Sequence, residues 1–343
     1  MRHLRDQGLA ANETGGFLAT AESASTRRSR LSFWGAEPRT SADLAVLCSG
    51  HAFGEVGTIQ GLSPVGKARA GDLAFVTDAR FDRKSVEAAL EGGAVVLMTE
   101  ESRSRLSPSA SGSVVVVGNP RLAFAQFLSA FVRPSPTARV SPTAIVSPSA
   151  RVHPSAHVGA FCWVGTQAVV GPGVVLQDRV SVGDGVRIGP NSIVRTGAVI
   201  GGEGFGFERD ENGRPVRLPH VGGVTLGKDV EVGALATVSS GTIDETRVGD
   251  GAKIGDNAHV AHNCVLGENV MLAAGVALAG SVRLADAVWL GPNASVKEGV
   301  SVGERSIVGI GSVVVRDVPS GEVWAGVPAK KLRDHRGACE GYN

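Results

Sequence analysis

The sequence has few aromatic residues and no long apolar run. Only 5% of its 343 residues are Phe, Trp or Tyr, and there is a single Tyr. A core built on rings is therefore excluded, and the 47 glycines favour a turn-rich β architecture packed with small aliphatic side chains. Because no stretch of about 18 apolar residues occurs, we predict no transmembrane segment.

Cysteine is sparse, and neither sign of charge dominates. Cys48, Cys162, Cys264 and Cys339 stand alone, without CxxC or CxH spacing. We therefore expect no structural metal, no tightly bound cofactor, no disulfide framework and a reducing, cytoplasmic location. With 34 basic and 33 acidic residues, nothing points to a nucleic-acid partner. Residues 1–38 are polar and lack the apolar core of a signal peptide, so we predict a disordered extension.

An aliphatic residue recurs at every sixth position over much of the chain. The first series is Val140, Val146, Val152, Val158, Val164, Val170, Leu176, Val182, Ile188, Val194 and Ile200. The second is Val248, Ile254, Val260, Leu266, Leu272, Leu278, Leu284, Leu290, Val296, Val302, Val308 and Val314. A period of six, dense in Gly and Pro, excludes an α-helix and predicts short strands joined by tight turns.

Three hexads would close one triangular coil of 18 residues, and stacked coils would pair in parallel. The fold class predicted is therefore mainly β, a left-handed parallel β-helix over 136–320. Residues 202–223 interrupt the repeat as an inserted loop, and a second break near 239–247 adds four residues. Loops that a solenoid does not need for stability are candidates for function. Residues 321–343 are expected to form a short carboxy-terminal tail.

A separate small α/β domain is predicted over 39–135. Residues 71–76, 94–98 and 113–118 have the composition of strands, whereas 85–93 and 119–132 have that of helices. The last helix would begin after Asn119, with Pro120 in its first position. Strands that alternate with helices indicate an α/β unit.

The strongest candidate for chemistry is His262, in the sequence HVAHN. It lies two residues after the inward Val260, in a turn, where a histidine has no packing role and could act as a general base. Gly280 follows one coil later, where a backbone N–H could hold a developing oxyanion. Cys264 falls at the small inward position of its hexad, and we interpret it as a core residue rather than a nucleophile.

Two groups of aromatic residues are weaker candidates. The segment GEGFGF, 202–207, is not a phosphate loop because no helix follows it, but Phe205 and Phe207 could wall a ligand pocket or pack against the β-helix. Phe75 and Phe81 flank the polar stretch TDAR and could sandwich a planar base. Taken alone, Phe75 and Phe81 are more typical of core aromatics.

Together these segments resemble a known family. GDLAFVTDARF, GNPRLAFAQF, GFGF, GTIDET, VAHN and LAGS occur in that order over about residues 60–330. The combination is similar to the UDP-3-O-acylglucosamine N-acyltransferases of lipid A biosynthesis. The resemblance implies an amino-terminal uridine-binding domain, a left-handed β-helix and a homotrimer with active sites between subunits. It also implies transfer of a hydroxyacyl chain from acyl carrier protein to the amine of a UDP-linked glucosamine.

Residue by residue, the resemblance implies that His262 is the catalytic base and that the Gly280 amide helps to form the oxyanion hole. The other residues to which it assigns substrate binding are Phe75 and Phe81 for uracil, with Asp78 where an Asn is usual; Glu203 (for a usual Asp), Phe205, Gly206 and Phe207 for the sugar; and His259 and Asn263 in the histidine motif. Further departures are Ser239 and Ser240 for a usual Asp and Arg, His259 for a usual Gln, and Gly299 for a second histidine.

The identity of the donor and a possible non-enzymatic role stay open at this point. The carboxy-terminal helices that receive acyl carrier protein in the family are not evident, and GVPAKKL, 326–332, resembles the end of coenzyme A-dependent acetyltransferases. A short-chain N-acetyltransferase of another UDP-amino sugar is therefore the main alternative, followed by a non-catalytic nucleotide-sugar scaffold. A metal-dependent lyase is disfavoured, because His259 and His262 are only three residues apart and His153 and His157 lie several coils away.

Overall fold

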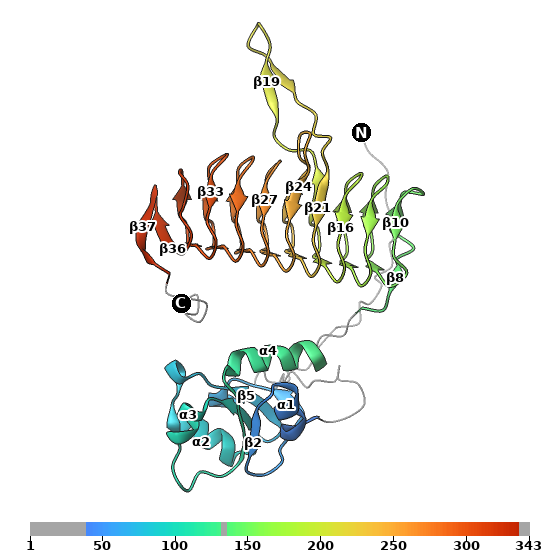
Figure 1. The fold of residues 1–343 in the computed structure, drawn as a ribbon. Coiled ribbons are helices and arrows are strands. Elements are labelled where there is room, and N and C mark those ends of the chain that lie inside the picture. The colour runs from blue at the N-terminus through green and yellow to red at the C-terminus, as the bar shows by residue number, and fades with distance from the viewer. Residues whose placement is uncertain (1–38, 132–135, 336–343) are drawn as a thin grey trace, which may run out of the picture. The chain divides into compact units, whose positions relative to one another are not determined.

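The computed structural model describes residues 39–131 and 136–335, which form two units divided between Ser135 and Pro136 (Figure 1). The predicted disordered extension, 1–38, lies outside the described residues. Among those described, no helix has the length and apolarity needed to cross a membrane.

The amino-terminal unit is a five-stranded sheet with helices around it. The strand order is β2 (His51–Phe53), β7 (Ser113–Val116), β6 (Val95–Met98), β5 (Asp72–Phe75) and β4 (Gly61–Leu62), parallel except for β2. The helices are α1 (Ser41–Leu47), α2 (Arg83–Glu91), α3 (Glu100–Ser104) and α4 (Pro120–Phe131), with short 3₁₀ turns at Val65–Lys67 and Asp78–Arg80. A two-stranded pair joins β1 (Arg39–Thr40) to β3 (Thr58–Ile59).

Alternate residues of the central strands pack into two separate hydrophobic cores, one on each face of this sheet. Leu73, Leu97 and Val115 pack with Phe127 of α4, whereas Val96 and Met98 pack with Val86 of α2. This is the side-chain alternation of a sheet that is covered on both faces. The predicted helices and strands are confirmed to within a few residues, and Asn119 caps α4 by accepting a hydrogen bond from the Leu122 N–H at 3.0 Å.

The second unit is a parallel β-helix with three faces. Face 1 contains β10 (Arg151–Val152), β13 (Val169–Val170), β16 (Arg187–Ile188), β21 (Val224–Leu226), β24 (Thr246–Val248), β27 (Val265–Leu266), β30 (Arg283–Leu284) and β33 (Ser301–Val302). Face 2 contains β8 (Arg139–Val140), β11 (His157–Val158), β14 (Val175–Leu176), β17 (Ile193–Val194), β22 (Glu231–Val232), β25 (Lys253–Ile254), β28 (Met271–Leu272), β31 (Trp289–Leu290), β34 (Ile307–Val308), β36 (Glu322–Gly326) and β37 (Ala329–Asp334). Face 3 contains β9 (Ile145–Val146), β12 (Trp163–Val164), β15 (Ser181–Val182), β18 (Val199–Gly202), β23 (Thr237–Ser239), β26 (His259–Val260), β29 (Ala277–Leu278), β32 (Ser295–Val296) and β35 (Val313–Val314).

The predicted repeat length of 18 residues is confirmed by the strand register. Val158 pairs with Leu176, and Val260 pairs with Leu278. From Val158 onward the hexad residues are buried in one continuous core that extends along the helix, whereas Val140 at its first coil is about half exposed. Several corners place Asn in the left-handed region, for example Asn191, Asn257 and Asn263 with φ near 60°, a conformation that Asn tolerates better than most residues.

The two interruptions of the repeat leave the helix after neighbouring strands of face 3, β18 and β23, and bond to each other. The first carries the hairpin of β19 (Phe207–Arg209) and β20 (Pro215–Arg217), which projects beyond the helix edge in Figure 1. Its return segment meets the second, since the Gly222 N–H donates to the Gly241 carbonyl at 2.8 Å and the Val221 N–H to the Thr242 carbonyl at 3.0 Å. The loops therefore form one bonded structure.

The residues expected as a tail form ordered structure as far as His335. Strand β36 pairs with β34 in parallel and β37 pairs with β36 antiparallel, so face 2 ends in a reversed strand. Trp324 is buried at this end, where it closes the core. The hexad period stops before β36, which explains why the repeat did not predict this pair.

Candidate active site

His262 lies at the corner between β26 on face 3 and β27 on face 1, half-buried and outside the helix core. Its Nδ1 is 3.0 Å from Oδ1 of Asn263. Asn263 is oriented by the second interruption: its Nδ2 donates to the Asp244 carbonyl at 3.1 Å, and its Oδ1 accepts from the Thr242 hydroxyl at 2.9 Å. The second interruption thus fixes the Asn263 side chain, which in turn orients the His262 ring.

This network assigns the tautomer of His262. The Asp244 carbonyl can only accept, so the Asn263 Nδ2 must face it and Oδ1 must face His262. Oδ1 can only accept, so Nδ1 of His262 carries the proton. Nε2 is then left with its lone pair, which is the form that a general base requires.

Gly280 stacks directly on His262, as the 18-residue register predicts. A Cβ at position 280 would lie 2.5 Å from Cε1 and 2.8 Å from Nε2 of His262. Real Cβ contacts are essentially never this short, so the imidazole occupies the space that any other residue would fill. Glycine is required here by the close approach of the ring.

The Gly280 N–H lacks the carboxylate cap that several equivalent corners have. At five equivalent corners the N–H is capped by an Asp one coil later, at 2.5–2.9 Å: Ala160 by Asp178, Thr166 by Asp184, Lys228 by Asp250, Ala234 by Asp256 and Glu268 by Asp286. Glu298 stands in the capping position for Gly280. Within the described ranges, the Gly280 N–H donates to no such carboxylate, which leaves a donor beside His262 for a ligand oxygen.

A second histidine, which the sequence pattern did not single out, lies against His262. The His220 ring is 5.0 Å from it, centroid to centroid, at an interplanar angle of 59°. His220 is 7% exposed, and neither ring nitrogen has a hydrogen-bond partner in the described structure. Burial, then the neighbouring His262, lowers the pKa of His220 below its usual 6.5. The only available signal was a lone His in a loop already considered functional.

The GFGF segment packs on this histidine pair. A Cβ at Gly206 would lie 2.5 Å from Cε1 of His220, and one at Gly204 would lie 3.2 Å from Cβ of His262. Phe205 is 86% exposed and meets Phe207 edge to face at 5.1 Å. The glycines therefore fit the histidines, while the two rings lie at the surface of the loop.

Arg217 connects the acidic and aromatic residues of this loop. Its guanidinium is 3.0 Å from the Glu203 carboxylate and 4.6 Å from the Phe207 ring centroid. Both charged side chains are about half exposed, so the pair orients the loop more than it stabilises the fold.

The remaining residues near this site are His259, Ser239, Ser240 and Cys264. His259 faces outward on β26, and its Nδ1 lies 2.6 Å from the Thr237 hydroxyl. Ser239 and Ser240 are buried, and Ser240 donates to the Gly201 carbonyl at 3.1 Å. Cys264 is fully buried, and burial raises the pKa of its thiol to about 11. It is a core residue, as interpreted from its hexad position.

The amino-terminal unit has a cavity of its own, of about 440 Å³. Its lining includes Phe75 and Phe124, whose rings are 4.9 Å apart, together with Pro64 and Arg80. Phe81, the other ring predicted to hold a base, packs in the core on the opposite face of the sheet, with Arg105 above it at 4.2 Å. In this structure the aromatic partner of Phe75 is therefore Phe124.

Asp78 is occupied by helix α3. Its Oδ1 accepts hydrogen bonds from the hydroxyls of Ser102 and Thr99, and these bonds hold the pKa of Asp78 below its usual range. The carboxylate is thus ionised and engaged where the resemblance places a base-binding side chain.

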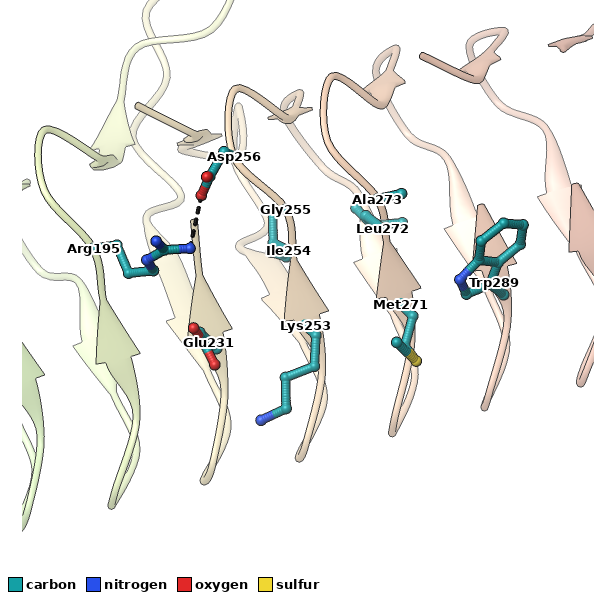
Figure 2. A pocket seen from close by; sticks show the side chains of 10 residues that line it. All are labelled: Arg195, Glu231, Lys253, Ile254, Gly255, Asp256, Met271, Leu272, Ala273 and Trp289. Atoms are coloured by element: carbon teal, nitrogen blue, oxygen red, sulfur yellow. Dashed lines mark hydrogen bonds and ion pairs between the residues drawn. The ribbon is translucent and has the colours of Figure 1, made fainter. Parts of the chain in front are cut away.

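A further cavity, of about 390 Å³, lies on face 2 of the β-helix (Figure 2). Figure 2 shows Lys253, Met271 and Trp289 one after another on successive strands, beside an Arg195–Asp256 ion pair of 3.0 Å. His262 is not among its lining residues, so this cavity is separate from the histidine site. Among the described residues, no group of three His, Cys, Asp or Glu side chains is arranged to hold a metal ion.

Comparison with known proteins first defines the class of fold. The family of bacterial transferases with hexapeptide repeats matches residues 245–280, the segment that holds His262 and Gly280. The UDP-N-acetylglucosamine acyltransferase of Francisella novicida superposes with a TM-score of 0.53 at 27% identity, over 57% of this chain and 70% of that one. The O-acyltransferase of Moraxella catarrhalis gives 0.52 at 28%, over 57% and 75%. The fold is thus a left-handed β-helix of this acyltransferase type.

Curated relatives then narrow the resemblance. The UDP-3-O-acylglucosamine N-acyltransferase of Coxiella burnetii is 34% identical over 213 residues, and that of Ectopseudomonas mendocina is 44% identical over 216. These matches cover 56% and 57% of this chain, and 60% and 59% of the two relatives. The chain therefore spans about three fifths of the length of the relatives it matches, and the resemblance to these N-acyltransferases is confirmed over that part.

Proposed function

We propose that this protein transfers an acyl group from a thioester donor to the amino group of a UDP-linked amino sugar, as in lipid A biosynthesis. The observation that carries the proposal is the stack of His262 on Gly280, with a free Nε2 lone pair and an uncapped N–H side by side. A base and an oxyanion donor are the two groups that acyl transfer to an amine needs.

In the mechanism, Nε2 of His262 takes a proton as the amine attacks the thioester carbon. A C–N bond forms, and the carbonyl oxygen becomes an oxyanion that the Gly280 N–H stabilises. When the tetrahedral intermediate collapses, the C–S bond breaks, and the leaving thiolate accepts the proton from the imidazolium. The Asn263 side chain keeps Nδ1 protonated throughout.

The acceptor would be recognised at two places. Phe75 borders the cavity of the amino-terminal unit, which has the volume and the aromatic lining to hold a uracil ring. Asp78 and Phe81, the other residues proposed for uracil, follow Phe75 closely in the sequence but do not line this cavity. Glu203, Phe205, Gly206 and Phe207 would border the sugar next to His262, together with His259 and Asn263. The supporting observation is the packing of Gly206 on the histidine pair.

The donor proposed is a hydroxyacyl chain on acyl carrier protein, and the assembly proposed is a cytoplasmic homotrimer. Support comes from the family resemblance and from the unpaired thiols of Cys48, Cys162 and Cys264, which suit a reducing compartment. The alternative donor, acetyl-coenzyme A, is favoured by the GVPAKKL sequence at 326–332. Light scattering after gel filtration would test the trimer, with a mass three times 35.1 kDa expected.

The experiment that tests the function is mass spectrometry of products from UDP-amino sugars, each offered with hydroxyacyl carrier protein and with acetyl-coenzyme A. We expect a long-chain amide on 3-O-acylated UDP-glucosamine. An acetyl amide on another UDP-amino sugar would establish the alternative, and no amide from any pair would reject the proposal.

A matched pair of variants tests the base. His262→Ala should lower the turnover number by about 100-fold or more, because the amine proton loses its acceptor, while the melting temperature changes little. His153→Ala, an exposed histidine on the same β-helix, should leave both unchanged. A large loss of melting temperature with full activity in His262→Ala would remove His262 from the mechanism.

A further inference from the structure

In the described structure the buried ring of His220 lacks a hydrogen-bond partner of ordinary geometry. A buried polar side chain nearly always has a hydrogen-bond partner, and leaving one unpaired costs about 1–3 kcal/mol. His220 is more than nine-tenths buried, and neither of its ring nitrogens makes a hydrogen bond of ordinary geometry within the described residues, although the nearby Leu218 carbonyl acts to raise its pKa. A ligand that enters beside His262 would supply what is missing.

The surroundings of His220 hold it in one place. The segment that follows is fixed by the Val221 and Gly222 N–H groups, which donate to the second interruption, and the Leu218 N–H donates to the Gly206 carbonyl at 3.0 Å. Gly206 packs against Cε1, so the ring cannot move toward the loop. His220 is therefore positioned against the His262 ring before any ligand arrives.

We infer that His220 selects an amine over a hydroxyl as the acceptor, by accepting a second hydrogen bond from the attacking –NH₂ group. An amine has two N–H bonds beside its lone pair, and two adjacent imidazoles offer two acceptors. With one N–H directed to Nε2 of His262 and the other to His220, the nitrogen lone pair is directed at the thioester carbon. A hydroxyl has one O–H bond and leaves the second imidazole without a donor.

The step balances without a further reactant. The proton on the His262 side moves to Nε2 as the C–N bond forms, and it leaves with the thiolate when the C–S bond breaks. The N–H directed at His220 stays on nitrogen and becomes the N–H of the amide product. The depressed pKa of His220 keeps its imidazole neutral and able to accept near neutral pH. This inference rests on the proposed function and assigns the selectivity for an amine acceptor to His220.

The solved structures that share the fold show why a selecting group is needed. The Moraxella catarrhalis protein is an O-acyltransferase, whereas the curated relatives are N-acyltransferases. A base and an oxyanion donor serve both reactions equally, so they do not distinguish nitrogen from oxygen. A second hydrogen-bond acceptor distinguishes them, because only a nucleophile with two protons can donate to both imidazoles.

The test uses the full chain and three forms of residue 220: wild type, His220→Phe, which keeps the ring but cannot accept, and His220→Gln, which can. Each form is given the UDP-linked 2-amino sugar and, separately, its 2-hydroxy analogue, with the same acyl donor. The amide and ester products are quantified by mass spectrometry. We expect His220→Phe to lower amide formation by about 10- to 100-fold and to leave ester formation unchanged, and His220→Gln to restore the amide.

Calorimetric binding of the two acceptors gives a second readout that needs no turnover. The affinity of His220→Phe for the amine should fall about 10-fold, with the hydroxy analogue unaffected. Equal losses for both acceptors, or an unchanged amide-to-ester ratio in His220→Phe, would overturn the inference. If wild type forms no acyl product from any donor, the proposed function fails instead, and melting temperatures identify any variant that does not fold.

Discussion

At the scale of single residues, the site depends on which atoms carry protons. Asn263 decides this for His262, because its amide is fixed by Asp244 and Thr242 of the neighbouring loop. The same loop bonds to the segment that carries His220. The chemistry of one imidazole is thus determined by hydrogen bonds that come from both interruptions of the repeat.

Removing the amide of Asn263 should disturb catalysis more than binding. In Asn263→Ala, His262 can adopt the other tautomer, and we expect the turnover number to fall by about 10- to 100-fold with little change in KM. Steady-state kinetics measure both. Asn269→Ala, at an equivalent left-handed corner one hexad later, serves as a control for backbone strain. A similar loss in both variants would contradict the orienting role.

Gly280→Ala should abolish most activity for a steric reason. The new methyl would overlap the His262 ring at 2.5 Å, so the ring must move away from the oxyanion donor, and we expect a loss of about 100-fold or more. Gly118→Ala adds a methyl in open space at an ordinary φ and should be silent. Full activity in Gly280→Ala would show that the stack is not needed.

Because of His220, the free energy of unfolding should decrease as the pH is lowered. The pKa of His220 in the folded chain is depressed by burial and then by His262; the Leu218 carbonyl and Glu203 oppose this with smaller effects, and Arg217 adds slightly to it. As pH falls below 6.5, the unfolded chain takes up a proton that the folded chain refuses, so the free energy of unfolding decreases. Urea unfolding at several pH values should therefore show a shallower acid loss for His220→Gln than for wild type. Parallel curves would mean that His220 titrates normally.

At the scale of elements, the hexads were predictable and the internal structure of the interruptions was not. Val260 and Leu278 both face inward because a strand alternates its side chains, so the 18-residue period by itself places His262 next to Gly280. Loop 202–223 has no period, so nothing in the sequence located His220 against the His262 ring. The contact of Asp78 with helix α3 was hidden for the same reason, because Thr99 and Ser102 reach the carboxylate only through tertiary folding.

The projecting hairpin should contribute to acceptor binding but little to stability. Arg217→Ala frees both Glu203 and Phe207, so we expect a raised KM for the UDP-amino sugar and a change in unfolding free energy within about 0.5 kcal/mol. Arg209, whose guanidinium bonds only to the hairpin's own Gly213 carbonyl among the described contacts, is the control. An unchanged KM in Arg217→Ala would separate the loop from the acceptor.

At the scale of the whole molecule, the chain has independent cores. The β-helix core contains no residue of the amino-terminal unit, whose own two clusters lie on either side of its sheet. We therefore expect a fragment of residues 136–335 to fold alone, with the circular dichroism of a β protein, and to bind UDP far more weakly than the full chain. Uridine affinity retained by the fragment would place the base site on the β-helix.

The reversed strand β37 has a consequence for self-association. A stack of parallel strands presents, at its last rung, a row of unpaired amides and carbonyls on which a further chain could add, as in the growth of an amyloid fibre. On face 2 that last rung is β37, which runs against the direction of the rungs below it and exposes Lys330, Lys331 and Arg333. Lys331 is paired with Glu322 and Asp334, so the edge carries both signs of charge in a fixed order, to which the equally directed strand of another end does not conform. A strand that breaks the repeat thus interrupts the parallel ladder of face 2, and the next strand to add there would have to pair with a reversed edge.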